Sequence, residues 1–248
     1  MLPDMPWLQL LPAWLAVATG ALIQGTVGFG IALIAAPLLL LIKPELIPGP
    51  MMFATFFLTS LTWWRERHAV HWQDVGGAWI GRMAGTVTGT IAMALLPGSI
   101  LVPTMGFLIV VGAFMSMHIR PFQPTRPILM VAGLMSGIMG TMTSAGGPPM
   151  LLALQHVSGA RLRATLGAFF TLGIVFSLAS LTMIDRFGLR EALQGISFVP
   201  AILFGFFLSN RLLTVIDKKW LRRLALAFSA GSGIMIVAGS LAKWMAEQ

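Results

Sequence analysis

The stretch "GTMTSAGGPP", residues 140–149, decides the fold because it cannot continue the helix that the preceding residues favour. Three hydroxyl side chains are followed by two glycines and two consecutive prolines. A proline inside a helix removes a backbone donor and clashes with the preceding turn, at a cost of roughly 3 kcal/mol or more. Apolar segments at 127–140 and 147–157 flank the stretch. We therefore predict a broken helix whose second part begins at the prolines.

The composition places this break in a membrane. Of the 248 residues, 57% are hydrophobic and 10% are charged, and the mean hydropathy is +0.87. A soluble domain carries about one quarter charged residues, so the bilayer is the expected solvent. The net charge of +8 suggests cytoplasmic loops near anionic lipid and no nucleic-acid partner. We predict an all-α polytopic membrane protein with apolar segments at 8–24, 29–43, 49–64, 75–97, 100–118, 127–140, 147–157, 164–184, 190–212 and 220–242.

A second glycine-rich stretch, "IQGTVGFGIALIAAPLL" at 23–39, resembles the first. A shift of 112 residues superposes glycines and prolines at identical spacing: Gly25 on Gly137, Gly28 on Gly140 and Pro37 on Pro149. Chance matches leucines in such chains but rarely this set. We infer an internal duplication with repeats of 8–118 and 127–242, which form a single transport domain over residues 1–248.

The basic residues indicate inverted repeats. If each short pair is a broken-helix hairpin, each repeat has three further spans, and the second repeat is upside down. Eleven basic residues then lie on one side and four on the other, with Arg82 inside a span: Arg65, Arg67, Arg120, Arg126, Arg161, Arg163, Arg211, Lys218, Lys219, Arg222 and Arg223 against Lys43, Arg186, Arg190 and Lys243. The positive-inside rule favours this arrangement, with eight to ten membrane helices and both termini periplasmic. A conventional eight-span topology is the alternative.

The two breaks are the predicted substrate site. Every backbone N–H and C=O in hydrocarbon needs a partner, so a broken helix must line a protein-walled or water-filled cavity. Free N–H groups and helix N-termini favour an anion there. The alternative is that these small residues only let helices pack closely. The candidate substrate-binding residues are Gln24, Gly25, Thr26, Gly28, Phe29, Gly30, Thr59, Arg82, Thr141, Thr143, Ser144, Gly146, Gly147 and Thr171.

Arg82 is the most informative charge because it lies inside the span 75–97. An ionisable residue at membrane depth is a candidate functional site, and its donor fork suits an anionic oxygen group. Alternatively, it snorkels to lipid phosphates. Thr59 and Thr171 are related by the duplication; they line the cavity or satisfy their own helix carbonyls. No span carries an Asp or Glu near its middle.

Three stretches in order resemble the TauE/SafE sulfite exporter family, also called the toluene sulfonate uptake permeases: "IQGTVGFGIALIAAPLLLL" at 23–41, "GIMGTMTSAGGPPMLL" at 137–152 and "RLRATLGAFFTLG" at 161–173. The resemblance spans nearly the whole chain. It implies a transporter of sulfite, sulfoacetate or a related organosulfonate in the bacterial inner membrane, generally working as an exporter.

This resemblance sets the functional expectations. We expect a non-enzymatic exporter of small sulfur-containing anions, with the lipid bilayer and the anion as its partners, no metal and no cofactor. The alternatives are an uptake permease for another small organic anion and a non-transporting membrane assembly subunit. A homodimer is left open.

Overall fold

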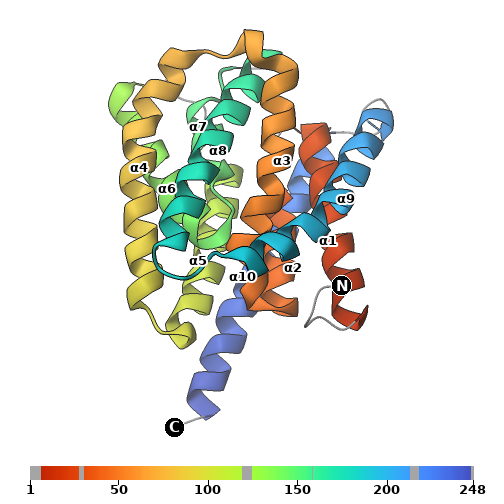
Figure 1. The fold of residues 1–248 in the computed structure, drawn as a ribbon, viewed down its shortest axis with the longest axis vertical. Coiled ribbons are helices and arrows are strands. Elements are labelled where there is room, and N and C mark those ends of the chain that lie inside the picture. Colours follow the sequence, from red (N-terminus) through yellow and green to blue (C-terminus); the bar gives the residue numbers. More distant parts are fainter. Residues whose placement is uncertain (1–6, 28–30, 119–124, 158, 213–217, 247–248) are drawn as a thin grey trace.

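The computed structural model describes residues 7–27, 31–118, 125–157, 159–212 and 218–246. These residues form ten α-helices and two 3₁₀ turns and contain no strand (Figure 1). The elements are α1 (Trp7–Val27), α2 (Ile31–Ile42), η1 (Pro44–Leu46), α3 (Gly49–Glu66), η2 (Arg67–Ala69), α4 (Trp72–Leu95), α5 (Gly98–His118), α6 (Arg126–Thr143), α7 (Gly147–Ala153), α8 (Gly159–Thr182), α9 (Leu189–Leu212) and α10 (Lys218–Ala246). The predicted all-α class is confirmed.

Several helices have the length and outer surface of membrane spans. Five stretches of the described residues are long and apolar enough to cross a bilayer: Pro44–Ala69, Gly98–Met117, Gly159–Thr182, Leu189–Ser209 and Arg223–Met245. Helix α4 is less apolar as a whole but has two distinct faces. Ile80, Val87 and Ile91 are exposed on one face, whereas Arg82 and Thr86 are buried on the other. An apolar outer face and a polar inner face are expected of a span in a polytopic membrane protein.

The break in the second half lies where the sequence predicts it. Helix α6 ends at Thr143 and α7 begins at Gly147. Helix α7 has seven residues, about 10 Å of rise, so it is shorter than the predicted segment 147–157 and cannot cross the bilayer. In the first half, α1 ends at Val27 and α2 begins at Ile31. Residues 28–30 lie outside the described part of the chain.

The glycines that superpose between the two stretches, Gly25, Gly137 and Gly140, do not lie in the gaps between helices. All three are helical. A Cβ added at Gly25 would overlap the Oγ of Ser209 in α9, and a Cβ at Gly137 would lie 2.6 Å from the carbonyl oxygen of Arg82 in α4. Gly25 and Gly137 therefore permit close helix packing, which was the alternative interpretation, whereas a Cβ added at Gly140 would meet the guanidinium of Arg82.

The tightest helix contact joins α4 and α6. A Cβ added at Gly81 or Gly85 would overlap carbonyl oxygens of α6, and one added at Gly133 would overlap the carbonyl oxygen of Ala78 in α4. The two backbones therefore touch without intervening side chains. Contacts from Ala78–Gly133 to Gly89–Ile138 advance together along both helices, so α4 and α6 run in the same direction.

Helices α1 and α9 form a similar contact. Gly205 of α9 meets Ala18 of α1, and Ser209 meets Gly25, so these two helices also run in the same direction. Gly195 of α9 lies against Pro50, which places the first turns of α9 and α3 at one end of the molecule. Helix α1 packs on α9, and α4 packs on α6. Each of these contacts therefore joins a helix of the first half of the chain to a helix of the second half.

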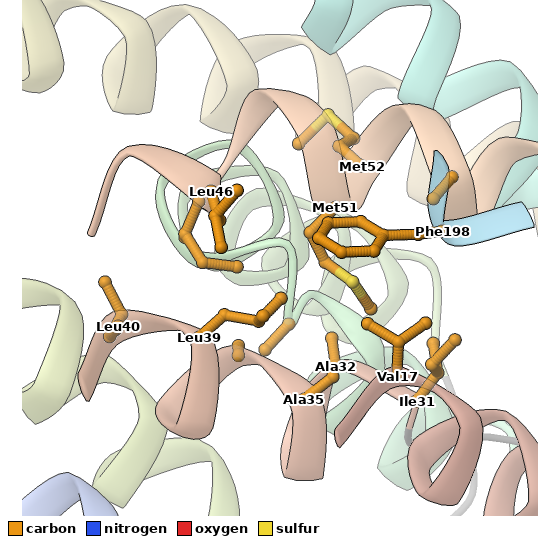
Figure 2. Packing of buried hydrophobic residues seen from close by; sticks show 14 of the residues in the cluster. Val17, Ile31, Ala32, Ala35, Leu39, Leu40, Leu46, Met51, Met52 and Phe198 are labelled. Atoms are coloured by element: carbon orange, nitrogen blue, oxygen red, sulfur yellow. The ribbon is translucent and has the colours of Figure 1, made fainter. Parts of the chain in front are cut away.

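The apolar core surrounds α2. In Figure 2, Ala32, Ala35 and Leu39 of α2 face Met51 of α3, with Phe198 of α9 beside them. All five side chains belong to one buried cluster. This packing holds α2 against α3 and α9 and so fixes the position of the helix that follows the first break.

The α4–α6 contact predicts an asymmetric response to glycine replacement within one helix. Gly85→Ala places a methyl group where it overlaps the carbonyl oxygen of Leu134. Overpacking of this kind lowers the free energy of unfolding by about 1–3 kcal/mol. Gly76, also in α4, has no atom within 4 Å of an added Cβ, so Gly76→Ala is the matched control. We expect a lower thermal midpoint in detergent for Gly85→Ala and an unchanged or raised midpoint for Gly76→Ala. Equal midpoints would contradict the contact.

Candidate functional site

The break between α6 and α7 is a defined turn. Ser144 has φ 60° and ends α6, and its N–H donates to the carbonyl of Gly140 over 2.9 Å. The Oγ1 of Thr143 donates to the carbonyl of Met139 over 2.7 Å and accepts the N–H of Ala145 over 3.1 Å. Thr143 therefore stabilises the turn, and its hydrogen-bonding capacity is used locally.

Two serines connect this turn to the neighbouring helices. Ser136 Oγ donates to the carbonyl of Gly146 over 2.6 Å, which ties the turn back onto α6. Ser144 Oγ donates to the carbonyl of Pro48 over 3.0 Å, which ties it to the start of α3. Pro148 offers no N–H, so the turn presents few free amides.

The first break is closed by a side chain. The Oε1 of Gln24 in α1 accepts the N–H of Ile31, the first residue of α2, over 3.0 Å. Gln24 thus satisfies an N–H group that the helix start leaves unpaired. Gly28, Phe29 and Gly30 lie outside the described residues. Thr26 is in α1, and its side chain is likewise outside the described part.

The side chain of Arg82 is buried in the protein interior, at 1% exposure. Its Nη1 donates to the carbonyl and, over 3.1 Å, to the Oγ of Ser136, and its Nη2 donates to Ser177 Oγ over 3.4 Å. The guanidinium carbon lies 5.7 Å from the ring centroid of Phe169. The snorkelling interpretation is therefore wrong, because the side chain turns toward α6 and α8 instead of the bilayer surface.

Three glycines make room for the guanidinium. A Cβ added at Gly140 would lie 2.6 Å from Nη1 of Arg82, one at Gly146 2.9 Å from the same atom, and one at Gly173 2.7 Å from Nε. They come from α6, the turn after it and α8. The site is thus shaped around this one side chain.

No carboxylate among the described residues lies within ion-pair distance of Arg82. The carboxylate of Glu66 pairs with Arg65 and Arg163 instead. The Nε of Arg82 is buried and has no hydrogen-bond partner within the same part of the chain. A buried charge without an ionic partner is costly, and no carboxylate in the described part of the chain offsets this one.

The guanidinium opens onto a cavity of about 60 Å³. One water needs roughly 10–15 Å³ of such space, so several waters or one small anion can fit. The lining comes from α1, α2, α3, α4, α6, α7 and α8 and the turn between α6 and α7: Gln24, Ile31, Ala32, Leu33, Met52, Thr55, Thr59, Thr62, Arg82, Gly140, Ser144, Ala145, Gly146, Gly147, Pro148, Arg163, Leu166, Gly167, Phe170 and Ile174.

The structure brings six of the predicted site residues to this cavity: Gln24, Thr59, Arg82, Ser144, Gly146 and Gly147. Thr59 also donates to the carbonyl of Phe56 over 3.1 Å, so both interpretations of this residue hold. Gly25, Thr141, Thr143 and Thr171 are not among the lining residues. Thr141 is 3.0 Å from Ser177 Oγ, and the Thr171 hydroxyl is buried without a partner among the described residues.

Sequence reasoning missed four uncharged polar residues of the site. Thr55 and Thr62 lie on the same face of α3 as Thr59, at helical spacing, and this polar stripe in an apolar helix was a readable signal. Ser136 and Ser177 hold the guanidinium. Nothing in the spacing of these serines predicts that they meet Arg82, because they belong to different helices.

A long apolar helical chain in which Gln24 and the turn between α6 and α7 line one cavity with the buried Arg82 is consistent with an anion transporter. The profile of the sulfite exporter TauE/SafE family matches residues 13–236. The chain belongs to this family. Members of the sulfite exporter family are membrane transporters of sulfur-containing anions such as sulfite, not enzymes, and the several apolar helices fit that role. No curated protein and no solved structure matches the chain.

Gly173 offers a test of whether the glycines around Arg82 make room for its guanidinium. Gly173→Ala places a methyl group against Nε, and the guanidinium can move because it ends a flexible side chain. We expect the protein to fold and its sulfite-dependent flux to fall at least about tenfold, as for the loss of one hydrogen bond to a charged group. The control is Gly231→Ala in α10, where an added Cβ meets nothing within 4 Å. A wild-type flux for Gly173→Ala would contradict the claim that the space left by Gly173 is needed for the position of Arg82.

Proposed function

We propose that this protein exports a small sulfur oxyanion, sulfite or an organosulfonate such as sulfoacetate, through a site at Arg82. The observation that carries the proposal is the buried guanidinium of Arg82, which faces a cavity and has no carboxylate partner within the described residues. Family membership supplies the class of substrate. The glycine-rich break between α6 and α7 shapes the site.

The guanidinium suits sulfite and sulfonate groups. Its planar fork presents several N–H donors that match paired anionic oxygens. In the structure, Ser136 and Ser177 accept hydrogen bonds from Nη1 and Nη2 of Arg82, and Nε has no partner in the described part. An anion on the cavity side would use Nε and compete with the weak Ser177 contact.

Hydroxyl groups on α3 continue the polar lining of the cavity. Thr55, Thr59 and Thr62 each donate to a carbonyl of their own helix. A hydroxyl can rotate and donate to an anion instead. Such exchangeable donors stabilise a passing anion without the strong, slow binding that a second buried cation would cause.

The organisation proposed for this transport domain is two inverted repeats, 8–118 and 127–242. The helix directions support it. Helices α1 and α9 run together, α4 and α6 run together, and the first turns of α9 and α3 share one end. Arg163 of α8 pairs with Glu66 at the end of α3, so α8 begins where α3 finishes. Both broken regions contribute to the cavity, through Gln24 and through Ser144–Gly147.

The orientation proposed in the bacterial inner membrane places η2 and the link between α7 and α8 in the cytoplasm. Figure 1 shows η2 at the top of the view and the C-terminal end of α10 at the bottom. The basic residues Arg65, Arg67 and Arg163 lie at or beside the η2 end. The positive-inside rule therefore favours a cytoplasmic η2 and a periplasmic C-terminus.

Arg82 variants test the site directly. Arg82→Met removes a buried charge, so we expect its thermal midpoint without anion to equal or exceed that of the wild type. Sulfite should raise the wild-type midpoint and leave that of Arg82→Met unchanged. In proteoliposomes, sulfite flux should fall by roughly 100-fold or more in Arg82→Met, since several charge-assisted hydrogen bonds are lost, and less in Arg82→Lys.

The outcomes separate the rival functions. No flux of any small anion through the wild-type protein would favour an assembly subunit. Flux that accumulates the anion inside intact cells would favour an uptake permease. Wild-type flux in both Arg82 variants would exclude Arg82 from the site.

Cysteine labelling tests the orientation, because the chain has no native cysteine. With single substitutions and a membrane-impermeant thiol reagent on intact cells, Pro97→Cys between α4 and α5 and Gln248→Cys at the chain end should both react. Ala69→Cys in η2 should react only after the cells are opened. Labelling of Ala69→Cys in intact cells would reverse the orientation.

A further inference from the structure

A second arginine lies in the same cavity, at the first turns of α8. Arg163 lines the cavity and binds Glu66 in a bidentate manner: Nε lies 3.0 and 3.1 Å from the two carboxylate oxygens, and Nη2 lies 2.7 Å from Oε1. Sequence analysis counted Arg163 only as a basic loop residue, and the transport site described above does not use it.

The two arginines lie at different depths along α8. Arg82 touches this helix at Gly173, ten residues after Arg163, which corresponds to roughly 15 Å along the helix axis. The cavity lining includes residues of α8 from Arg163 to Ile174. One cavity therefore carries a buried cation inside and a partly exposed cation, at 36% side-chain exposure, near its end.

Glu66 has a second cationic partner already within reach. Its Oε1 lies 3.3 Å from Nη2 of Arg65, whose side chain is 47% exposed, whereas the carboxylate of Glu66 is mostly covered at 13%. Glu66 can therefore stay paired with Arg65 when its hydrogen bonds to Arg163 are lost. The carboxylate is not committed to one partner.

A carboxylate and a small oxyanion bind a guanidinium in the same way, through paired oxygens on the donor fork. An anion that reaches this end of the cavity meets Arg163 and competes with Glu66 for it. Because Arg65 can keep Glu66 neutralised, the exchange does not leave an unpaired carboxylate beside the incoming anion.

We propose that Arg163 is a second anion-binding site at the end of the cavity, and that Glu66 occupies it as an internal, displaceable stand-in for the substrate. This inference rests on the proposed function and adds a residue pair to it. The ligand class is a small oxyanion such as sulfite. An anion that enters replaces Glu66 as the partner of Arg163. When no anion is present, Glu66 neutralises Arg163.

A purely structural ion pair between α3 and α8 makes a different prediction. If the pair only ties the two helices, removing either partner breaks the same tie, and Glu66→Gln and Arg163→Gln change transport in the same direction. If Glu66 competes with the substrate, the two substitutions act in opposite directions. The sign of the two effects therefore decides between the two roles.

The experiment measures the sulfite concentration that gives half-maximal flux into proteoliposomes, at about 0.15 M salt to screen distant charges. Glu66→Gln is expected to lower this concentration about two- to fivefold and Arg163→Gln to raise it by a similar factor, the range for a partly exposed ion pair. The double variant should behave like Arg163→Gln alone, since Glu66 acts only through Arg163.

Two controls account for the change in net charge. Arg161→Gln removes a cation from the same turn of α8, but Arg161 does not line the cavity. Glu45→Gln removes a carboxylate from η1, outside the cavity lining. Both should leave the half-saturating concentration near the wild-type value. A shift in either control as large as that of its partner variant would overturn the proposal.

Parallel changes in Glu66→Gln and Arg163→Gln would also overturn it, as would a lowered half-saturating concentration when Glu66→Gln is added to Arg163→Gln. Thermal midpoints of all variants are recorded so that a loss of folded protein is not mistaken for a loss of affinity. Failure of the proposed function gives another result: the wild-type protein then shows no sulfite flux and no stabilisation by sulfite.

Discussion

The backbone contact between α4 and α6 is the constraint on which the rest of the site depends. Glycines on both helices remove the side chains that would hold them apart, so carbonyl and Cα atoms meet directly. The side chain of Arg82 extends from α4 at this contact, and its Nη1 donates directly to Ser136 of α6. With larger residues at Gly85 or Gly137, the guanidinium would be moved away from α6 and from the break that follows it. Close packing and the position of the Arg82 guanidinium are therefore consequences of the same small residues.

The guanidinium of Arg82 is a buried charge with no carboxylate partner in the part of the chain that the structure describes. Ser136, Ser177 and the ring of Phe169 solvate part of the guanidinium of Arg82, but none of them neutralises it. A buried charge of this kind costs stability, and the proposed binding of an anion would offset that cost. At the other end of the cavity the arrangement differs, because Arg163 has Glu66. In the proposed transport path, an anion would pass from the cation that is paired with Glu66 to the cation that has no carboxylate partner among the described residues.

The two glycine-rich stretches superpose in sequence, but in a register that differs from that of the helix ends. The glycines and prolines superpose with a shift of 112 residues. The helices on either side of the breaks correspond with a shift of 116, since α1 ends at 27 and α6 at 143, and α2 begins at 31 and α7 at 147. The difference of four residues is about one helical turn. This explains why Gly25 and Gly137 lie in helix–helix contacts instead of at the breaks, although their superposition pointed to the right regions.

The sequence by itself determined the features that depend on local chemistry. Apolar length set the helices, and the run of Gly146, Gly147, Pro148 and Pro149 ended α6 and started α7, because no continuous helix accommodates it. The exceptional position of Arg82 was also readable, since an ionisable residue at that depth is costly. Only the tertiary structure decided which way Arg82 turns, that Ser136 and Ser177 meet it, that Thr141 and Thr171 stay outside the cavity, and that Arg163 shares the cavity with it. These facts depend on how separate helices rotate and approach one another, and that is set by contacts between distant residues that no local pattern records.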